Sequence, residues 1–171
     1  MNKISKVIIL DSKPLAEICN PLNYQKTQPL IKFLKDEKIA LKIAEITDYE
    51  LRRELTLRDL HKGISNLNKF AQRKPIIPLC RESLIIATKL WADLRKAAQP
   101  TADNKNIDCD VIMVAQALKL QDRYDQIIIL TIDVKDLVRF KKFGIEVWDW
   151  KQALVDWKYK EVNLYNPLPF K

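Results

Sequence analysis

The sequence contains few of the residues that the best-known ligand-binding motifs require. Only two of its 171 residues are glycines, Gly63 and Gly144, so there is no glycine-rich loop of the kind that binds nucleotide phosphates. Its three cysteines are widely spaced and it has a single histidine, so no zinc-binding pattern is present. These shortages exclude P-loop nucleotide hydrolases, dinucleotide-binding enzymes and cysteine-based zinc modules.

Long apolar runs are also missing near the start of the chain. The first run covers only residues 7 to 10, which is too short for the core of a signal peptide or for a membrane span. The odd number of scattered cysteines is typical of reduced, mostly buried thiols. We therefore expect a cytoplasmic protein that does not enter a membrane, and its length suits one domain.

Positive charge is in excess. Thirty lysines and arginines face 22 aspartates and glutamates, a formal net charge of +8, in a composition that is 47% hydrophobic and typical of a globular protein. A basic surface attracts polyanions such as nucleic acids. The alternative is a soluble protein whose basic charge has no role in binding, and composition alone does not decide between the two.

Short apolar segments alternate with longer amphipathic ones along the chain. The pattern predicts strands at residues 7–10, 39–44, 76–79, 126–130 and 145–147. It predicts helices from residue 14, and at 28–38, 47–72 with a break near Gly63, 82–98, 107–120, 134–142 and 152–157. This alternation is typical of an α/β fold with a mainly parallel sheet of four to five strands, covered on both faces.

Acidic residues recur where these predicted elements begin or end. Asp11 and Asp133 each follow a predicted strand, Glu50 and Asp110 lie in the first turns of predicted helices, and Asp108 directly precedes one. The carboxyl ends of parallel strands line the crevice in which open α/β sheets bind ligands. Carboxylates gathered there repel one another, so they share protons or hold a hard cation. We therefore expect a divalent-metal hydrolase.

Several of these acids also have a purely structural interpretation. Glu50 has the spacing of a capping box with Thr47, which would start a helix at Thr47. One member of the Asp108–Asp110 pair is expected to be a helix N-cap, and Asp133 can be one as well. The sequence leaves these alternatives open.

Four motifs in order give the sequence a resemblance to a known family. They are Val7-Ile-Ile-Leu-Asp11, Thr47-Asp-Tyr-Glu50-Leu51, Asp110 before an Ile/Ala-rich helix, and Thr131-Ile-Asp133. Over roughly residues 4 to 150 the chain resembles PIN-domain ribonucleases, in particular the VapC-type toxins of bacterial toxin–antitoxin pairs. The resemblance implies a three-layer α/β/α sandwich, with a PIN-like domain at residues 1–150 and a C-terminal extension at residues 151–171.

The resemblance also implies an activity and its cofactor. It predicts a metal-dependent endoribonuclease that hydrolyses RNA phosphodiester bonds with Mg²⁺ or Mn²⁺ and acts as the toxin of a toxin–antitoxin pair. The implied partners are RNA, a cognate antitoxin and a second copy of the chain. The implied catalytic carboxylates are Asp11, Glu50, Asp110 and Asp133; the implied metal ligands are Asp11, Asp110 and Asp133, with Asp108 as an added one.

Further roles follow for residues near these acids. Ser12 and Thr131 are candidates to hydrogen-bond the carboxylates. Lys13, Arg52 and Arg53 are candidates to contact the substrate, although such charges also commonly solvate a helix face. Lys13 departs from the family pattern, which has a small or polar residue there, and it can pair with an acid, contact phosphate or hinder metal binding.

Two other functions compete with this one. A catalytically silent PIN-like module would bind nucleic acid or protein without hydrolysis, and Lys13 is its main support. A flavodoxin-like receiver domain also gathers acids at strand ends, but it requires an acidic pair near the first strand, and the sequence offers no convincing pair near Asp11.

Overall fold

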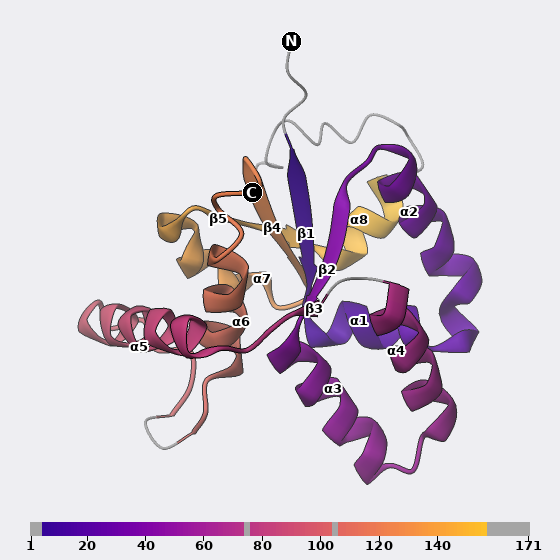
Figure 1. Ribbon diagram of the computed structural model, residues 1–171, viewed down its shortest axis with the longest axis horizontal. Helices are drawn as coiled ribbons and strands as arrows, with labels where there is room; N and C mark the ends of the chain where they lie inside the picture. Colours follow the sequence, from indigo (N-terminus) through magenta and orange to yellow (C-terminus); the bar gives the residue numbers. More distant parts are fainter. Residues whose placement is uncertain (1–4, 74–75, 104–105, 157–171) are drawn as a thin grey trace.

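A single parallel sheet forms the centre of the molecule. The computed structural model describes residues 5–73, 76–103 and 106–156. Its five strands lie in the order β3-β2-β1-β4-β5, and every neighbouring pair is parallel (Figure 1). The strands are β1 (Lys6–Leu10), β2 (Ala40–Ala44), β3 (Ile76–Ile77), β4 (Gln126–Thr131) and β5 (Ile145–Asp149). The predicted α/β class and strand positions are confirmed.

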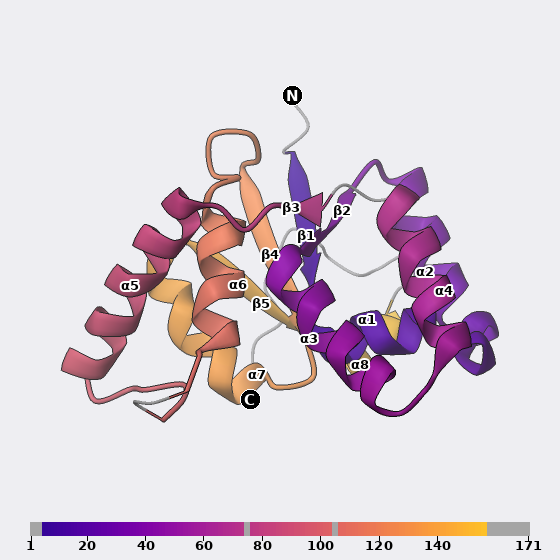
Figure 2. The same cartoon turned by 60° about the horizontal axis from the view of Figure 1, so that its bottom comes forward.

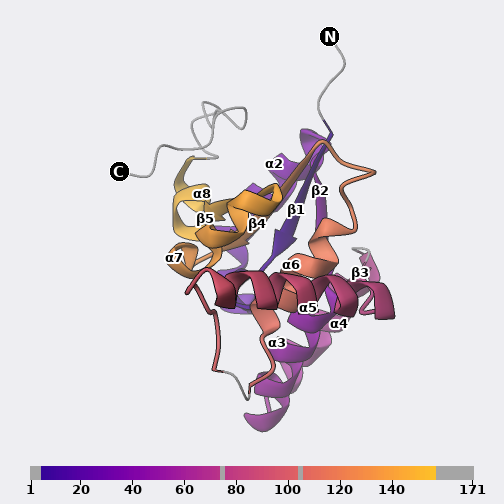
Figure 3. The same ribbon diagram turned by 90° about the vertical axis from the view of Figure 1, so that its left-hand side faces the viewer.

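Helices cover both faces of this sheet. The α-helices are α1 (Ser12–Cys19), α2 (Tyr24–Asp36), α3 (Glu45–Leu57), α4 (His61–Arg73), α5 (Arg81–Lys96), α6 (Cys109–Leu118), α7 (Val134–Leu137) and α8 (Trp150–Asp156). Two 3₁₀ segments join them, η1 (Pro21–Asn23) and η2 (Val138–Phe143). Helices α5, α6 and α7 lie on one side of the strands, and α1, α2 and α4 lie on the other (Figure 2). Seen from the side, α5 is the outermost helix and covers α6 (Figure 3).

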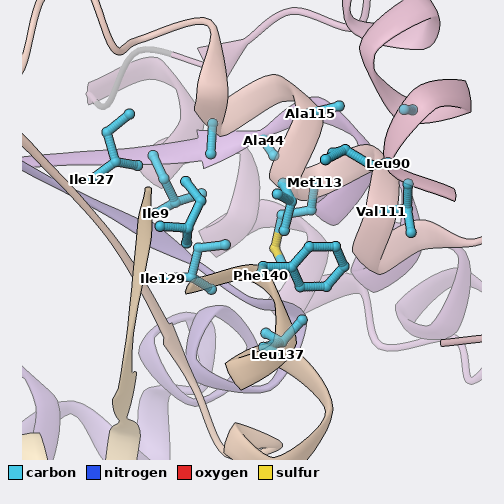
Figure 4. Packing of buried hydrophobic residues seen from close by; sticks show 14 of the residues in the cluster. Ile9, Ala44, Leu90, Val111, Met113, Ala115, Ile127, Ile129, Leu137 and Phe140 are labelled. Carbon is cyan, nitrogen blue, oxygen red and sulfur yellow. The ribbon is translucent and has the colours of Figure 1, made fainter. Parts of the chain in front are cut away.

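The strands are buried on both faces because their apolar side chains alternate between two cores. Ile8 and Leu10 of β1 pack with α1, α2 and α8, whereas Val7 and Ile9 pack with α5 and α6. Figure 4 shows the second core, in which side chains of β1 and β4 meet those of α6 and η2. Near-continuous apolar runs are what a parallel strand between two helical layers requires.

The predicted helix at residues 47–72 is in fact two helices. The chain turns at residues 58–60, where Asp59 takes a left-handed conformation with φ of 52°. The break predicted near Gly63 is therefore present but lies slightly earlier, and Gly63 itself lies inside α4. A Cβ atom at Gly63 would meet the Leu55 side chain at 3.0 Å, so the glycine permits close packing of α4 on α3.

The predicted capping box at Thr47 is also wrong. Helix α3 begins at Glu45, directly after β2, and Ala44 at its N-cap makes no side-chain capping hydrogen bond. Thr47 is buried inside the first turn. The capping interpretation of Glu50 therefore fails, which leaves its carboxylate available for another role.

The C-terminal part of the described chain packs on the sheet. The predicted helix at residues 134–142 is a single α-helical turn followed by η2, and Gly144 ends it with φ of 88°. In α8, Trp150 and Leu154 are buried in the core. The predicted extension thus begins with a packed helix, and residues 157–171 lie outside the described ranges. None of the described helices combines the length and apolar character needed to cross a lipid bilayer.

Candidate functional site

The topology of the sheet creates a switch point between β1 and β4. From β1 the chain adds β2 and β3 on one side, and it later adds β4 and β5 on the other. In open α/β sheets, ligands bind outside the carboxyl ends of the strands at such a switch point. Asp11 directly follows β1, and Asp133 follows β4 after one intervening residue. The fold therefore brings the first and last acids of the predicted set to the same edge.

Asp11 is held in place by hydrogen bonds of its side chain and of its backbone. Its carboxylate accepts from the Ser12 backbone N–H at 2.6 Å and from the Thr131 hydroxyl at 2.6 Å. Its own N–H donates to the Leu130 carbonyl at 3.1 Å, which continues the pairing of β1 with β4. The residue is 7% exposed. Burial raises the pKa of Asp11, the Thr131 and Ser12 hydrogen bonds oppose this, and the charge of Asp133 adds to it.

Thr131 links the two acids at this edge. While its hydroxyl donates to Asp11, the same oxygen accepts from the Asp133 backbone N–H at 2.9 Å. Asp133 occupies the N-cap position of α7, but its side chain makes no capping hydrogen bond and is exposed. The carboxylate of Asp133 is therefore not used to start the helix.

Glu50 and Asp110 approach the same region from two helices. Helix α3 lies between α1 and α6 and contacts both helices (Figure 2). Burial and the charge of Asp11 raise the pKa of Glu50, while Arg53, a hydrogen bond with the Ser12 side chain and Lys13 lower it. Burial, followed by the charges of Asp11, Asp108 and Glu50, raises the pKa of Asp110 to about 7.

These couplings define a group that we name the acidic centre: Asp11, Glu50, Asp110 and Asp133. The charge of Asp11 interacts with that of each of the other three carboxylates. Within the described residues, no three histidine, cysteine or acidic side chains are already grouped tightly enough to enclose a metal ion. The donors are all carboxylate oxygens, which suit a hard cation such as Mg²⁺ or Mn²⁺ better than zinc.

Asp108 has a structural task that distinguishes it from Asp110. It is the N-cap of α6, where its carboxylate accepts from the Val111 N–H at 3.2 Å. The Thr101 hydroxyl also donates to it, and the residue is 9% exposed. One member of the acidic pair is thus an N-cap, as the sequence indicates. Asp110, in the first turn of α6, is the member that contributes to the acidic centre.

The two neighbouring arginines of α3 have different surroundings. The guanidinium of Arg52 donates to both carboxylate oxygens of Asp48 at 2.9 Å and to the Asn68 side chain at 2.8 Å. Arg53 and Lys13 are exposed, and the positive charge of each lowers the pKa of Glu50. Of the three predicted substrate contacts, these two lie beside the acidic centre, whereas Arg52 joins α3 to α4.

A buried amide outside the four sequence motifs positions α3. Gln116 of α6 is fully buried; its side chain accepts from the Ile46 N–H at 3.2 Å and donates to the Ile77 carbonyl at 2.5 Å. It thereby supplies the cap that Ala44 does not, and it fixes the helix that carries Glu50 to α6 and β3. The signal in the sequence is a single amide within the apolar run of α6.

Comparison with solved structures shows the same fold. The chain is similar to a structure of VapBC2 from Rickettsia felis bound to a DNA fragment from their promoter, with 17% identity, a TM-score of 0.62, and coverage of 84% of this chain and 99% of that one. The chain is also similar to a structure of VapBC-1 from nontypeable Haemophilus influenzae, with 19% identity, a TM-score of 0.57, and coverage of 85% of this chain and 98% of that one. A structure of FitAB bound to an IR36 DNA fragment has 18% identity and a TM-score of 0.57, with coverage of 83% of this chain and 94% of that one.

The similarity is one of fold, because the sequences differ at about four positions in five. No family model matches the sequence, and no curated protein matches it. The resemblance to PIN-domain toxins expected from four short motifs is thus confirmed for the three-dimensional structure.

Proposed function

We propose that this protein is a metal-dependent endoribonuclease and the toxin of a toxin–antitoxin pair. One observation carries the proposal. Four carboxylates that lie far apart in the sequence form the acidic centre at the switch point of a sheet whose solved neighbours are VapBC and FitAB structures. The acidic centre is needed in addition to the structural neighbours, because a shared fold alone does not establish an activity.

The carboxylates of the acidic centre fit a divalent cation by their chemistry. Asp11, Asp110 and Asp133 would hold Mg²⁺ or Mn²⁺, with Glu50 as a further ligand or the group that orients the attacking water. When bound, the ion would lower the pKa of water and offset charge on the attacked phosphate. Asp108 is a weaker candidate as a ligand, because its oxygens already accept from Val111 and Thr101.

The remaining contacts position these groups. Hydrogen bonds from Thr131 and Ser12 hold the carboxylate of Asp11 in one orientation before a metal ion binds. Lys13 and Arg53 place positive charge next to Glu50, where a substrate phosphate would lie. The net charge of +8 favours a polyanionic substrate, and we assign RNA as that substrate.

An antitoxin is the second part of the proposal. The solved neighbours are described as VapBC and FitAB structures, two of them with DNA bound. We propose that a cognate antitoxin binds this chain in the cytoplasm and covers the acidic centre, and that the toxin itself is a homodimer. Light scattering of the purified chain, alone and with the antitoxin, measures both assemblies.

The direct test is cleavage of a mixed-sequence RNA pool in Mg²⁺. Asp11→Asn and Asp110→Asn should each abolish cleavage while circular dichroism shows a folded protein, and chelation should abolish it in the wild type. Asp122→Asn, at an exposed site outside the acidic centre, is the matched control and should cleave normally. Full activity of either centre variant removes that residue from the mechanism.

A catalytically silent PIN-like module is the alternative. It is favoured by Lys13 beside Glu50 and by the lack of a ready-made set of three ligands in the described residues. Calorimetric titration with Mn²⁺ separates the two functions. A nuclease should bind Mn²⁺ in a manner that Asp11→Asn eliminates, whereas a silent module should give no binding that depends on Asp11.

A further inference from the structure

A cysteine and a lysine from two helices meet away from the acidic centre. The ammonium of Lys119, at the end of α6, lies 2.8 Å from the sulfur of Cys80, the N-cap residue of α5. Helices α5 and α6 lie side by side, with the start of α5 next to the end of α6 (Figure 2). Asp110 is in the first turn of α6 and Lys119 is its C-cap, so the length of this helix separates the two sites.

Several donors surround the sulfur of Cys80. Besides the Lys119 ammonium, the backbone N–H groups of Ser83 and Glu82 donate to it, and the Ser83 hydroxyl lies 3.8 Å away. The Glu82 carboxylate, 2.9 Å from the Lys119 ammonium, holds the lysine in place. Lys119 first, and then the donors of α5, lower the pKa of Cys80 to about 7. A thiolate is the form of cysteine that reacts with oxidants, so this sulfur is ready to react near neutral pH.

Neither of the other cysteines is placed to form a disulfide with Cys80. Cys109 begins α6, ten residues before Lys119, which is about 15 Å along the helix. Cys19 is buried in the core on the opposite face of the sheet. Cys80 itself is partly exposed, so a small oxidant can reach it. The nucleophilic group that lies against its sulfur is the amine of Lys119.

We propose that Cys80 and Lys119 form an oxidation-sensitive pair, in which hydrogen peroxide links the cysteine sulfur to the lysine nitrogen. In the first step the thiolate attacks one peroxide oxygen and the O–O bond breaks. The Lys119 ammonium donates a proton to the departing hydroxide, which leaves as water. The sulfur is thereby oxidised to a sulfenic acid while the peroxide is reduced, and a neutral amine is left beside the sulfur.

The second step joins the two side chains. The lone pair of the Lys119 amine attacks the Cys80 sulfur, the S–O bond breaks, and the hydroxide leaves as water with a proton from the amine. The product is a sulfenamide, and one peroxide has given two waters. Two thiols of a reductant reverse the link: the first attacks the sulfur and releases the amine, and the second releases the Cys80 thiol as the reductant forms a disulfide.

The link would tie the start of α5 to the end of α6. Gln116 lies one turn before Lys119 on α6, where it accepts from the Ile46 N–H and donates to the Ile77 carbonyl. The new bond therefore closes next to the contact that holds α3 on α6. Oxidation would thus reinforce this part of the fold reversibly.

The experiment treats the purified chain with hydrogen peroxide at neutral pH and maps its tryptic peptides by mass spectrometry. The wild type should give a linked pair of peptides that contain Cys80 and Lys119, lighter than their sum by the mass of two hydrogen atoms. Dithiothreitol should separate the pair. Cys19 and Cys109 should stay unlinked.

Variants of the lysine separate the two steps. Lys119→Arg keeps a cation beside the sulfur, so it should still form a sulfenic acid, which dimedone traps, but no link. Lys119→Met removes the cation and should slow oxidation of Cys80 several-fold. Lys89→Arg, at an exposed site on α5, is the matched control and should form the link like the wild type.

Two results overturn the proposal. One is a wild type in which Cys80 is oxidised without any link to Lys119. The other is equal oxidation of Cys80 in the wild type and in Lys119→Met. Since none of these readouts involves RNA, they stand apart from the test of the proposed ribonuclease.

Discussion

Replacing Asp110 with asparagine should make the metal-free protein more stable while it removes activity. Burial and four neighbouring acids raise the pKa of Asp110 to about 7, against an ordinary value of 3.8. Between these two values the native state holds more protons than the unfolded state, so stability falls as pH rises through the window. The repulsion is fully present above pH 7 and absent in the neutral Asp110→Asn amide.

The size of the effect follows from the shift. A pKa difference of about three units lowers the free energy of unfolding of the wild type by about 4 kcal/mol at pH 8 and by about 1.5 kcal/mol at pH 5. Part of the side chain remains exposed and water screens that part, so we expect a measured gain of about 2 kcal/mol at pH 8 and well under 1 kcal/mol at pH 5.

The assay is urea denaturation followed by circular dichroism at both pH values in the presence of a chelator. The variant should unfold at a higher urea concentration than the wild type at pH 8, and the two should approach each other at pH 5. Adding Mg²⁺ at pH 8 should stabilise the wild type and leave the variant unchanged. A variant that is less stable than the wild type at pH 8, or a difference that does not depend on pH, would refute the electrostatic reasoning.

Three further outcomes are expected. Gln116→Leu leaves two buried backbone groups without partners and should lower the free energy of unfolding by about 2 kcal/mol in urea denaturation, with a parallel loss of RNA cleavage. Thr131→Val removes the hydroxyl that donates to the buried carboxylate of Asp11 and should weaken Mn²⁺ binding about 10-fold in calorimetry. The Lys119 ammonium, 2.8 Å from the Cys80 sulfur, lowers the pKa of that thiol to about 7, whereas burial raises the pKa of Cys19 to about 12. Iodoacetamide at pH 7 should therefore label Cys80 first, as read by mass spectrometry, and Lys119→Met should slow the labelling several-fold.

The sheet could be predicted because its signal is local. Strands of a buried parallel sheet are short apolar runs, and β1 and β4 have the β-branched residues that such strands favour. The order of acids after these runs then predicts that Asp11 and Asp133 meet, since parallel strands end at one edge. Glu50 and Asp110 interact electrostatically with Asp11, and their share in the site stays a prediction.

Features set by tertiary contacts could not be predicted in this way. The start of α3 depends on Gln116, which caps it from another helix, so the local capping signal at Thr47 had no effect. The end of α3 depends on the turn at Asp59 and on close packing against Gly63. Likewise, only the structure shows that Asp48 holds Arg52, whereas Arg53 is exposed and its charge lowers the pKa of Glu50.

The contact between Asp11 and Thr131 joins residues that are 120 positions apart. A ribosome must therefore deliver β4 before the first aspartate has its hydroxyl partner, and a growing chain that lacks this strand has no completed centre. Pairing of such distant strands is also slow, because a long loop must close first. Each new molecule thus lacks a completed acidic centre through most of its own translation.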